Sequence, residues 1–137
     1  MLASCASLQR SADSGVVRRV ADLVNAGNAQ KIAAMSATPF LVDGEIVALP
    51  ADVVSFWADA AKAGFKVDGA SLETGAAVGA DSYKLFADTM EVKAFFTRYV
   101  PRGSRTIDLA TSSGAHVRLI VHSGLFSTTL YGFKGPF

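Results

Sequence analysis

The chain has 137 residues, of which 50% are hydrophobic and 18% are charged, and its 13 basic and 12 acidic side chains give a formal net charge of +1. This length predicts one domain, and the apolar content excludes a largely disordered chain. The balanced charge offers no basic face for nucleic acid, and no run approaches the ~18 consecutive apolar residues that a membrane-spanning helix needs.

The first residues carry the only cysteine of the chain. Leu2, Ala3 and Ser4 before Cys5 resemble a lipobox, the motif at which bacterial lipoproteins are cleaved and acylated. The resemblance implies lipidation of Cys5 and attachment to the periplasmic side of the cell envelope, with residues 1–13 as an export remnant and tether. Such signals also have a positive segment and an apolar segment of about 7–15 residues, which do not precede Cys5 here. The alternative is an ordinary cysteine at the frayed terminus of a cytoplasmic protein.

Helical signals open the remainder of the chain, a single domain over residues 14–137. Apolar residues at helical spacing predict a helix that Ser14 caps and Gly27 ends. Asn28 is placed to cap a short second helix. Thr38-Pro39 ends this helix.

A hairpin and a third helix follow. Asp43-Gly44 predicts a type I′ turn in a hairpin over residues 40–48. Pro50 suits the first turn of a helix that runs to about residue 64. The expected buried face of this helix consists of Val53, Phe56, Trp57, Ala60 and Ala61.

The middle of the chain gives weaker signals. Residues 65–68 alternate as at the start of a strand, whereas the glycine-rich segment 69–79 supports no assignment. Helical turns are expected over residues 81–100, with Asp88 and Glu91 as a capping box.

The last third predicts a three-stranded antiparallel meander over residues 106–111, 116–122 and 126–133. The first loop places Asp108 opposite Arg118. A two-residue turn at Ser123-Gly124 would place His116 opposite Tyr131. One face of this sheet is then apolar, and the other brings Asp108, His116 and Arg118 together.

This order of elements, with the hairpin at 40–47 followed by Trp57 on a helix, resembles the nuclear transport factor 2-like superfamily, which includes polyketide cyclases of the SnoaL-like type and ketosteroid isomerases. The resemblance implies an α+β fold in which N-terminal helices pack on a strongly bent, antiparallel, cone-like sheet. It also implies a pocket inside the cone. Phe56, Trp57, Tyr83 and Phe96 are the expected pocket residues.

Two functions are consistent with these features. The favoured one is a non-catalytic envelope lipoprotein domain that binds a small apolar ligand or a protein partner, and a homodimer through the sheet face is expected from Ile120, Leu125, Tyr131 and Phe133. The alternative is a small isomerase, dehydratase or cyclase that uses Asp108 or His116 as general base, with Arg118 beside it. An ion pair on an ordinary sheet face explains the same three residues without catalysis. Two histidines and one cysteine, far apart in sequence, predict neither a metal site nor a cofactor.

Overall fold

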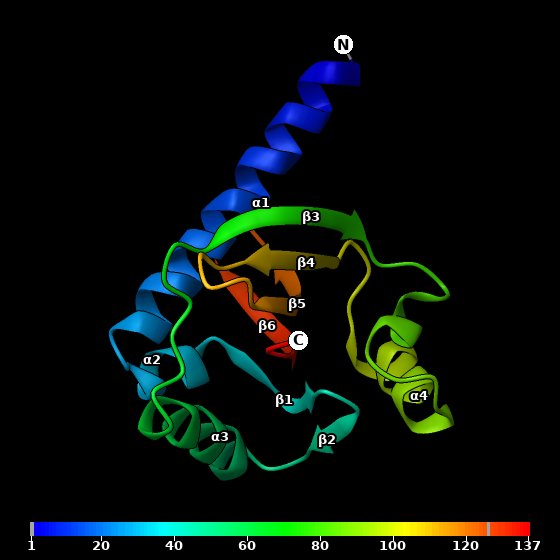
Figure 1. Ribbon diagram of the computed structural model, residues 1–137. Helices are drawn as coiled ribbons and strands as arrows, with labels where there is room; N and C mark the ends of the chain where they lie inside the picture. Colours follow the sequence, from blue (N-terminus) through cyan, green and yellow to red (C-terminus); the bar gives the residue numbers. More distant parts are fainter. Residues whose placement is uncertain (1, 126) are drawn as a thin grey trace.

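The computed structural model describes residues 2–125 and 127–137 (Figure 1). In chain order the elements are α1 (Leu2–Asn25), α2 (Ala29–Ala34), β1 (Ser36–Val42), β2 (Glu45–Val47), α3 (Pro50–Lys62), β3 (Ser71–Ala77), the 3₁₀ helix η1 (Ser82–Leu85), α4 (Met90–Tyr99), β4 (Arg105–Ala110), β5 (His116–Ser123) and β6 (Thr128–Lys134). The described residues form an α+β fold, as the sequence predicted. Their six strands make one sheet in the order β2-β1-β6-β5-β4-β3. The sheet is mixed rather than antiparallel throughout, because β1 runs parallel to β6.

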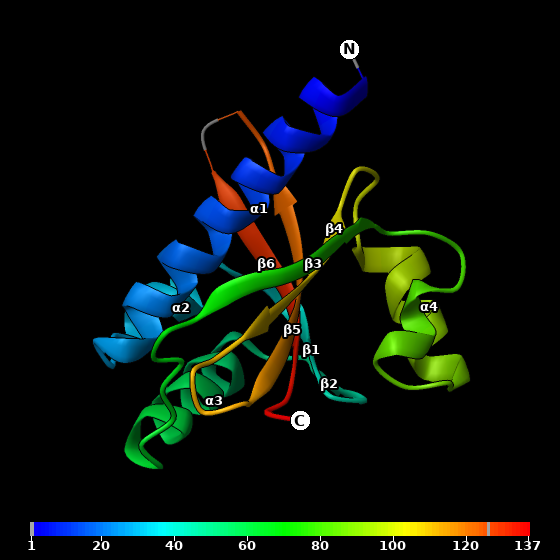
Figure 2. The ribbon, with the colours of Figure 1, turned by 45° about the horizontal axis from the view of Figure 1, so that its top comes forward.

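Helix α1 begins at Leu2, and not near Ser14 after a tether as the sequence predicted. Residues 5–12 are all exposed. They need no apolar face, so hydrophobic periodicity could not reveal this part of the helix. The later turns hold α1 to the sheet through the predicted stripe of Val17, Val20, Ala21 and Val24. The N-terminal end of α1 extends beyond the sheet (Figures 1 and 2).

The next two helices follow the sequence signals. The side chain of Asn28 caps α2 by accepting a hydrogen bond from the Lys31 amide. Pro50 lies in the first turn of α3, and Val53 and Trp57 are buried on its inner face. The strand predicted from Phe65 is absent, because residues 65–70 form an irregular connection with a turn.

The hairpin of β1 and β2 has the predicted register, with Leu41 opposite Ile46 and Val42 opposite Glu45. Asp43 adopts a φ of 56°, in the left-handed region that the first position of this turn requires. Its carboxylate also accepts a hydrogen bond from the Gly135 amide. The turn is therefore bonded to the segment that follows β6.

The glycine-rich segment 69–79, for which the sequence predicted no secondary structure, contains β3. This strand lies antiparallel to β4 at the edge of the sheet. The helical stretch expected over residues 81–100 is two elements, η1 and α4. Thr89 caps α4 by accepting a hydrogen bond from the Val92 amide at 3.2 Å, so the prediction of Asp88 as the cap was wrong.

The sequence predicted the register of both C-terminal hairpins, and the structure confirms the first and contradicts the second. Asp108 lies opposite Arg118, as expected. In the second hairpin Val121 lies opposite Leu130, and His116 has no partner on β6. A turn of two residues at 123–124 is too short, since Ser123 pairs with Thr128 and a bulge follows in the ladder. The predicted start of the last strand at residue 126 lies outside the described residues.

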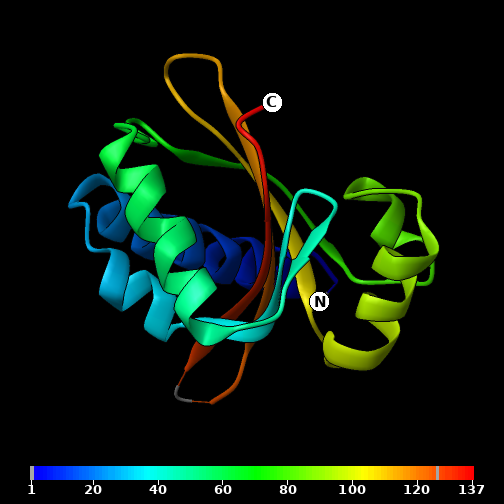
Figure 3. The same cartoon turned by 90° about the horizontal axis from the view of Figure 1, so that it is seen from below.

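Helices α1, α2 and α3 lie on one side of the sheet and α4 on the other (Figure 3), and an apolar core fills the space on each side. The larger core lies under α1, α2 and α3, and it includes Phe40, Trp57, Leu119, Leu130 and Phe133. The smaller core lies under η1 and α4, and it includes Leu41, Phe86, Phe95 and Ile120. Adjacent residues of the central strands, such as Leu119 and Ile120, enter opposite cores because side chains alternate across a strand.

Candidate functional site

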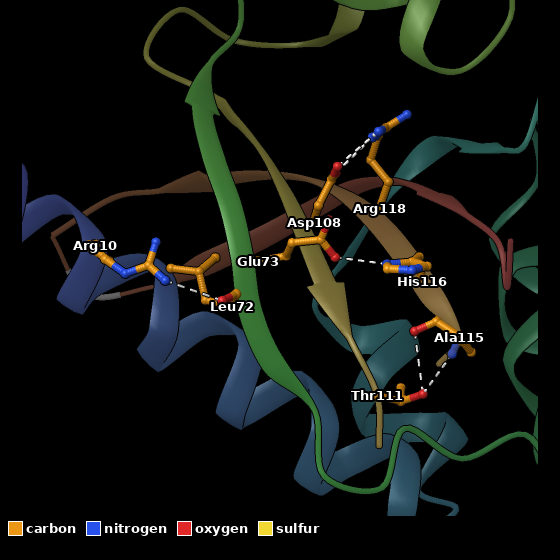
Figure 4. Close-up of polar contacts among 8 residues, drawn as sticks. All are labelled: Arg10, Leu72, Glu73, Asp108, Thr111, Ala115, His116 and Arg118. Atoms are coloured by element: carbon orange, nitrogen blue, oxygen red, sulfur yellow. Dashed lines mark hydrogen bonds and ion pairs between the residues drawn. The ribbon is translucent and has the colours of Figure 1, made fainter. Parts of the chain in front are cut away.

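The polar residues that the sequence placed on one sheet face do lie together. The Arg118 guanidinium donates from Nε to Asp108 Oδ1 at 2.7 Å and from Nη2 to Asp108 Oδ2 at 2.8 Å (Figure 4). The pKa of Arg118 is raised, chiefly because Asp108 accepts these hydrogen bonds. Burial acts in the opposite direction, and the attraction of Asp108 and Glu73 adds to the increase. Arg118 therefore keeps its charge at any physiological pH.

His116 lies beside this pair but bonds to a different carboxylate. Its Nδ1 is 2.8 Å from Glu73 Oε2, across the intervening strand β4 (Figure 4). The Phe137 ring lies near both basic groups, with its centroid 5.9 Å from that of His116 and 5.2 Å from Arg118 Cζ. We call Glu73, Asp108, His116 and Arg118 the outer charged group.

The outer charged group has the geometry of a cross-strand ion-pair ladder. Both carboxylate oxygens of Asp108 accept from Arg118, and Arg118 Nη1 donates to the Leu85 carbonyl at 2.8 Å. A general base needs a lone pair that faces a substrate, and each oxygen of Asp108 already accepts a hydrogen bond from Arg118. Together the two residues tie β4, β5 and η1 to one another.

The sheet divides the four residues expected to line one pocket. Phe56 and Trp57 lie on the side of the larger core, where Trp57 makes edge contacts with Phe56 and Phe133. Tyr83 and Phe96 lie in the smaller core on the opposite side. The sequence could not show this division, because it depends on which face of the sheet each helix covers.

The cavity beside Trp57 is too small for an organic ligand. Its volume is about 10 Å³, room for about one water molecule. Trp57 itself is held by a hydrogen bond from its indole Nε1 to Ser36 Oγ at 3.1 Å. Trp57 is therefore a residue of the larger core rather than the wall of a ligand pocket.

The dimer face expected on the sheet is also partly covered. Ile120 is buried under η1 and α4, and Phe133 is buried against the aromatic residues of α3. Leu125 is exposed, and Tyr131 is half-buried at the margin of the smaller core. These four residues do not form a continuous free surface.

A groove between the hairpin and α4, which we call the α4 groove, is a mainly apolar concavity on the outer side of the smaller core. Its volume is about 380 Å³. It is lined by Pro39, Ile46, Ala48, Glu91, Ala94, Phe95, Arg98 and Tyr99. The hairpin turn directs β2 to the sheet edge, and the cap at Thr89 starts α4 beside it. Phe95 forms the buried floor, while Glu91 and Arg98 carry charge at the rim.

Large apolar side chains remain exposed around the α4 groove. Ile46 is 41% exposed and Tyr99 is 44% exposed. Leu49 and Met90, which adjoin lining residues in the sequence, are more exposed still. The sequence signal for this surface was the spacing of residues 91, 94, 95 and 98, which places them on one helix face. Such spacing does not distinguish a face that packs on the sheet from one that borders a groove.

Cys5 is exposed in the first turns of α1. Among the described residues, no helix combines the length and apolar character that a membrane crossing requires. The same residues contain no cluster of three or more histidine, cysteine, aspartate or glutamate side chains suited to a metal ion.

Comparison with known proteins gives one similar structure. It is a domain of unknown function with a cystatin-like fold from Nostoc punctiforme, 18% identical, with a TM-score of 0.41 over 90% of this chain and 74% of that chain. No protein family matches the sequence, and neither does any curated protein.

The structural match corrects the resemblance expected from the sequence. The similar domain is described as cystatin-like, so the prediction of a nuclear transport factor 2-like or SnoaL-like domain was wrong. The order of elements that suggested it does not specify a superfamily, because several α+β folds share helices followed by a meander.

Proposed function

We propose that this chain is a non-catalytic binding domain whose α4 groove receives an apolar segment of a protein partner. The observation that supports this proposal is a concave apolar surface with Ile46 and Tyr99 partly exposed beside the buried ring of Phe95. Exposed apolar patches with a polar rim are typical of interaction sites. Covering them removes apolar area from water and favours association.

The residue types of the α4 groove suit a protein partner. Tyrosine and arginine contribute most often to binding hot spots, and Tyr99 and Arg98 lie side by side in sequence at one end of the groove. Glu91 lies seven residues earlier on the same helix face, about 10 Å away at 1.5 Å per residue. A partner with a basic group near Glu91 and an acidic group near Arg98 would bind in one orientation.

A small apolar ligand is the second candidate for the same groove. Its volume of about 380 Å³ falls within the ~300–1,000 Å³ of typical ligand sites. The exposure of Leu49 and Met90 beyond the groove favours the protein partner, since a small molecule would leave that surface uncovered.

The proposal assigns the outer charged group a structural role. In the enzymatic alternative, Asp108 or His116 would act as a base in a cavity. The bidentate bond of Asp108 with Arg118 favours the structural role instead. Lipidation of Cys5 stays a separate prediction, which this function does not need.

A photo-crosslinking residue in place of Tyr99 tests the proposal in the native cells. We expect a discrete protein adduct that disappears when Ile46→Asp is introduced, because a carboxylate in the groove opposes burial. The control variant Leu8→Gln removes an exposed apolar residue on α1, away from the groove, and should leave the adduct unchanged.

The identified partner is then titrated against the purified proteins. Ile46→Asp should weaken its affinity at least about tenfold, equivalent to ~1.4 kcal/mol. A protein adduct that is insensitive to Ile46→Asp would refute the proposal. A small molecule that co-purifies with the wild type, and not with Ile46→Asp, would favour the second candidate.

A further inference from the structure

A second concavity lies on the other side of the sheet, between the N-terminal half of α1 and the adjacent ends of β4 and β5. Figure 2 shows the end of β5 beside this part of α1. We call the concavity the α1 pocket, and its volume is about 200 Å³. It is lined by Gln9, Ala12, Asp13, Val16, Gly103, Arg105, Val121 and Ser123.

The α1 pocket contains a partly buried ion pair. Arg105 donates from Nε to Asp13 Oδ1 and from Nη2 to Asp13 Oδ2, each at 2.9 Å. The Asp13 side chain is 5% exposed and that of Arg105 is 22% exposed. Gln9 Nε2 donates a further hydrogen bond to Asp13 Oδ1 at 3.3 Å. The carboxylate is therefore fully partnered within the chain.

Strand β3 leaves space for this pair. A Cβ atom at Gly75 would overlap Asp13 Oδ2 and would lie 3.0 Å from Asp13 Cγ. Only glycine at this position lets the carboxylate approach the sheet. The pair thus depends on a residue of a third element, besides α1 and β4.

An ion pair of this kind is weak evidence for a stabilising role. Removing two charges from water costs several kcal/mol per ion, and well-packed apolar residues often replace a buried pair without loss. The rest of the lining combines apolar residues, Ala12, Val16 and Val121, with the polar side chains of Gln9 and Ser123. A charged pair in this wall is consistent with recognition of a polar group.

One donor of the pair has no partner within the described part of the protein. Arg105 Nη1 makes no hydrogen bond with the described residues, whereas every fully buried side-chain nitrogen or oxygen among them has a partner. Nη1 therefore reaches solvent, and Arg105 lines the pocket. An acceptor atom of a ligand can bind Nη1 without breaking the bonds to Asp13.

We propose that the α1 pocket binds a small neutral molecule through a carbonyl oxygen that accepts a hydrogen bond from Arg105 Nη1. Asp13 already balances the charge of Arg105, so an anion would bring an uncompensated charge near a carboxylate. A neutral acceptor avoids this cost. The volume lies below the ~300 Å³ of drug-sized sites, which limits the ligand to a single ring or a short chain.

Three probes of similar shape test this proposal: acetophenone, which has a neutral carbonyl, benzoate, which is an anion, and ethylbenzene, which has no acceptor. Each is titrated into the ¹⁵N-labelled full chain, and the signals of Val121, Ser123 and the Arg105 Nε–H are followed. We expect saturable shifts with acetophenone and at least about fivefold weaker binding of the other two probes.

Variants of the lining residues show whether the shifts arise from binding at Arg105. Arg105→Met should reduce the affinity for acetophenone to that for ethylbenzene, while the matched control Arg18→Met, at an exposed site on α1, should not change it. If Arg105→Met does not fold, Ala12→Phe fills the pocket without altering the ion pair and should abolish binding. Tighter binding of benzoate, equal binding of ethylbenzene, or no saturable shift at these residues would each overturn the proposal. None of these results depends on the α4 groove.

Discussion

Replacement of Gly75 by alanine tests the packing that carries the Asp13–Arg105 pair. The new Cβ would overlap Asp13 Oδ2 and would lie 3.3 Å from Arg105 Nη2. Strand β3 is paired with β4 along its length and cannot move away without loss of ladder hydrogen bonds. The carboxylate must therefore move, and the bidentate geometry is lost.

The expected cost follows from two contributions. Overpacking at a tightly packed position costs about 1–3 kcal/mol, and breaking a buried ion pair costs about 3–5 kcal/mol when one charge loses its partner. Because Arg105 is partly exposed and the pair is displaced rather than removed, we expect Gly75→Ala to lower the free energy of unfolding by about 2–4 kcal/mol. In the Asp13→Ala background the clash is absent, and the same substitution should cost less than about 1 kcal/mol.

Urea unfolding measures both values. Trp57 is the single tryptophan of the chain and is buried, so its fluorescence reports exposure of the larger core. Gly15→Ala is the matched control, since no atom lies within 4 Å of its added Cβ and alanine favours a helix by roughly 0.5–1 kcal/mol. Equal destabilisation by Gly75→Ala in the wild-type and Asp13→Ala backgrounds would refute the clash as the cause.

Four further outcomes are expected. Trp57→Ala should cost about 3–5 kcal/mol in chemical unfolding followed by circular dichroism, and a loss below about 1 kcal/mol would contradict its place in the core. Asp108→Ala should cost roughly 1–3 kcal/mol because the Arg118 guanidinium loses both of its hydrogen bonds to a carboxylate, and Asp108→Ala with Arg118→Leu should recover part of that loss. Arg118 has a raised pKa, so its stabilisation is lost only as pH rises through that value. The contribution of Arg118 to the free energy of unfolding should therefore be the same at pH 6 and pH 9. A loss of stability between these pH values that Arg118→Leu abolishes would contradict this. A chain with its native upstream sequence should enter the membrane fraction if Cys5 is lipidated, and Cys5→Ser should release it; unchanged fractionation would exclude the anchor.

Local chemistry in the sequence determined several elements by itself. The Asp43-Gly44 turn fixed the register of the first hairpin, because a two-residue turn leaves one pairing of the flanking residues. Asn28 and Pro50 marked two helix starts for reasons that act within one turn. The short loop after β4 likewise placed Asp108 opposite Arg118.

Interactions between distant segments decided the rest. The second C-terminal register depends on a bulge, and Arg10 and Asp13 of α1 contact the sheet ahead of the helix start that the sequence predicted. Asp13 and Arg105 lie 92 positions apart, so no local pattern could pair them. The α4 groove likewise exists only because β2 returns to the sheet edge beside α4. Local propensity acts over a few residues, whereas these features arise from which faces the sheet brings together in space.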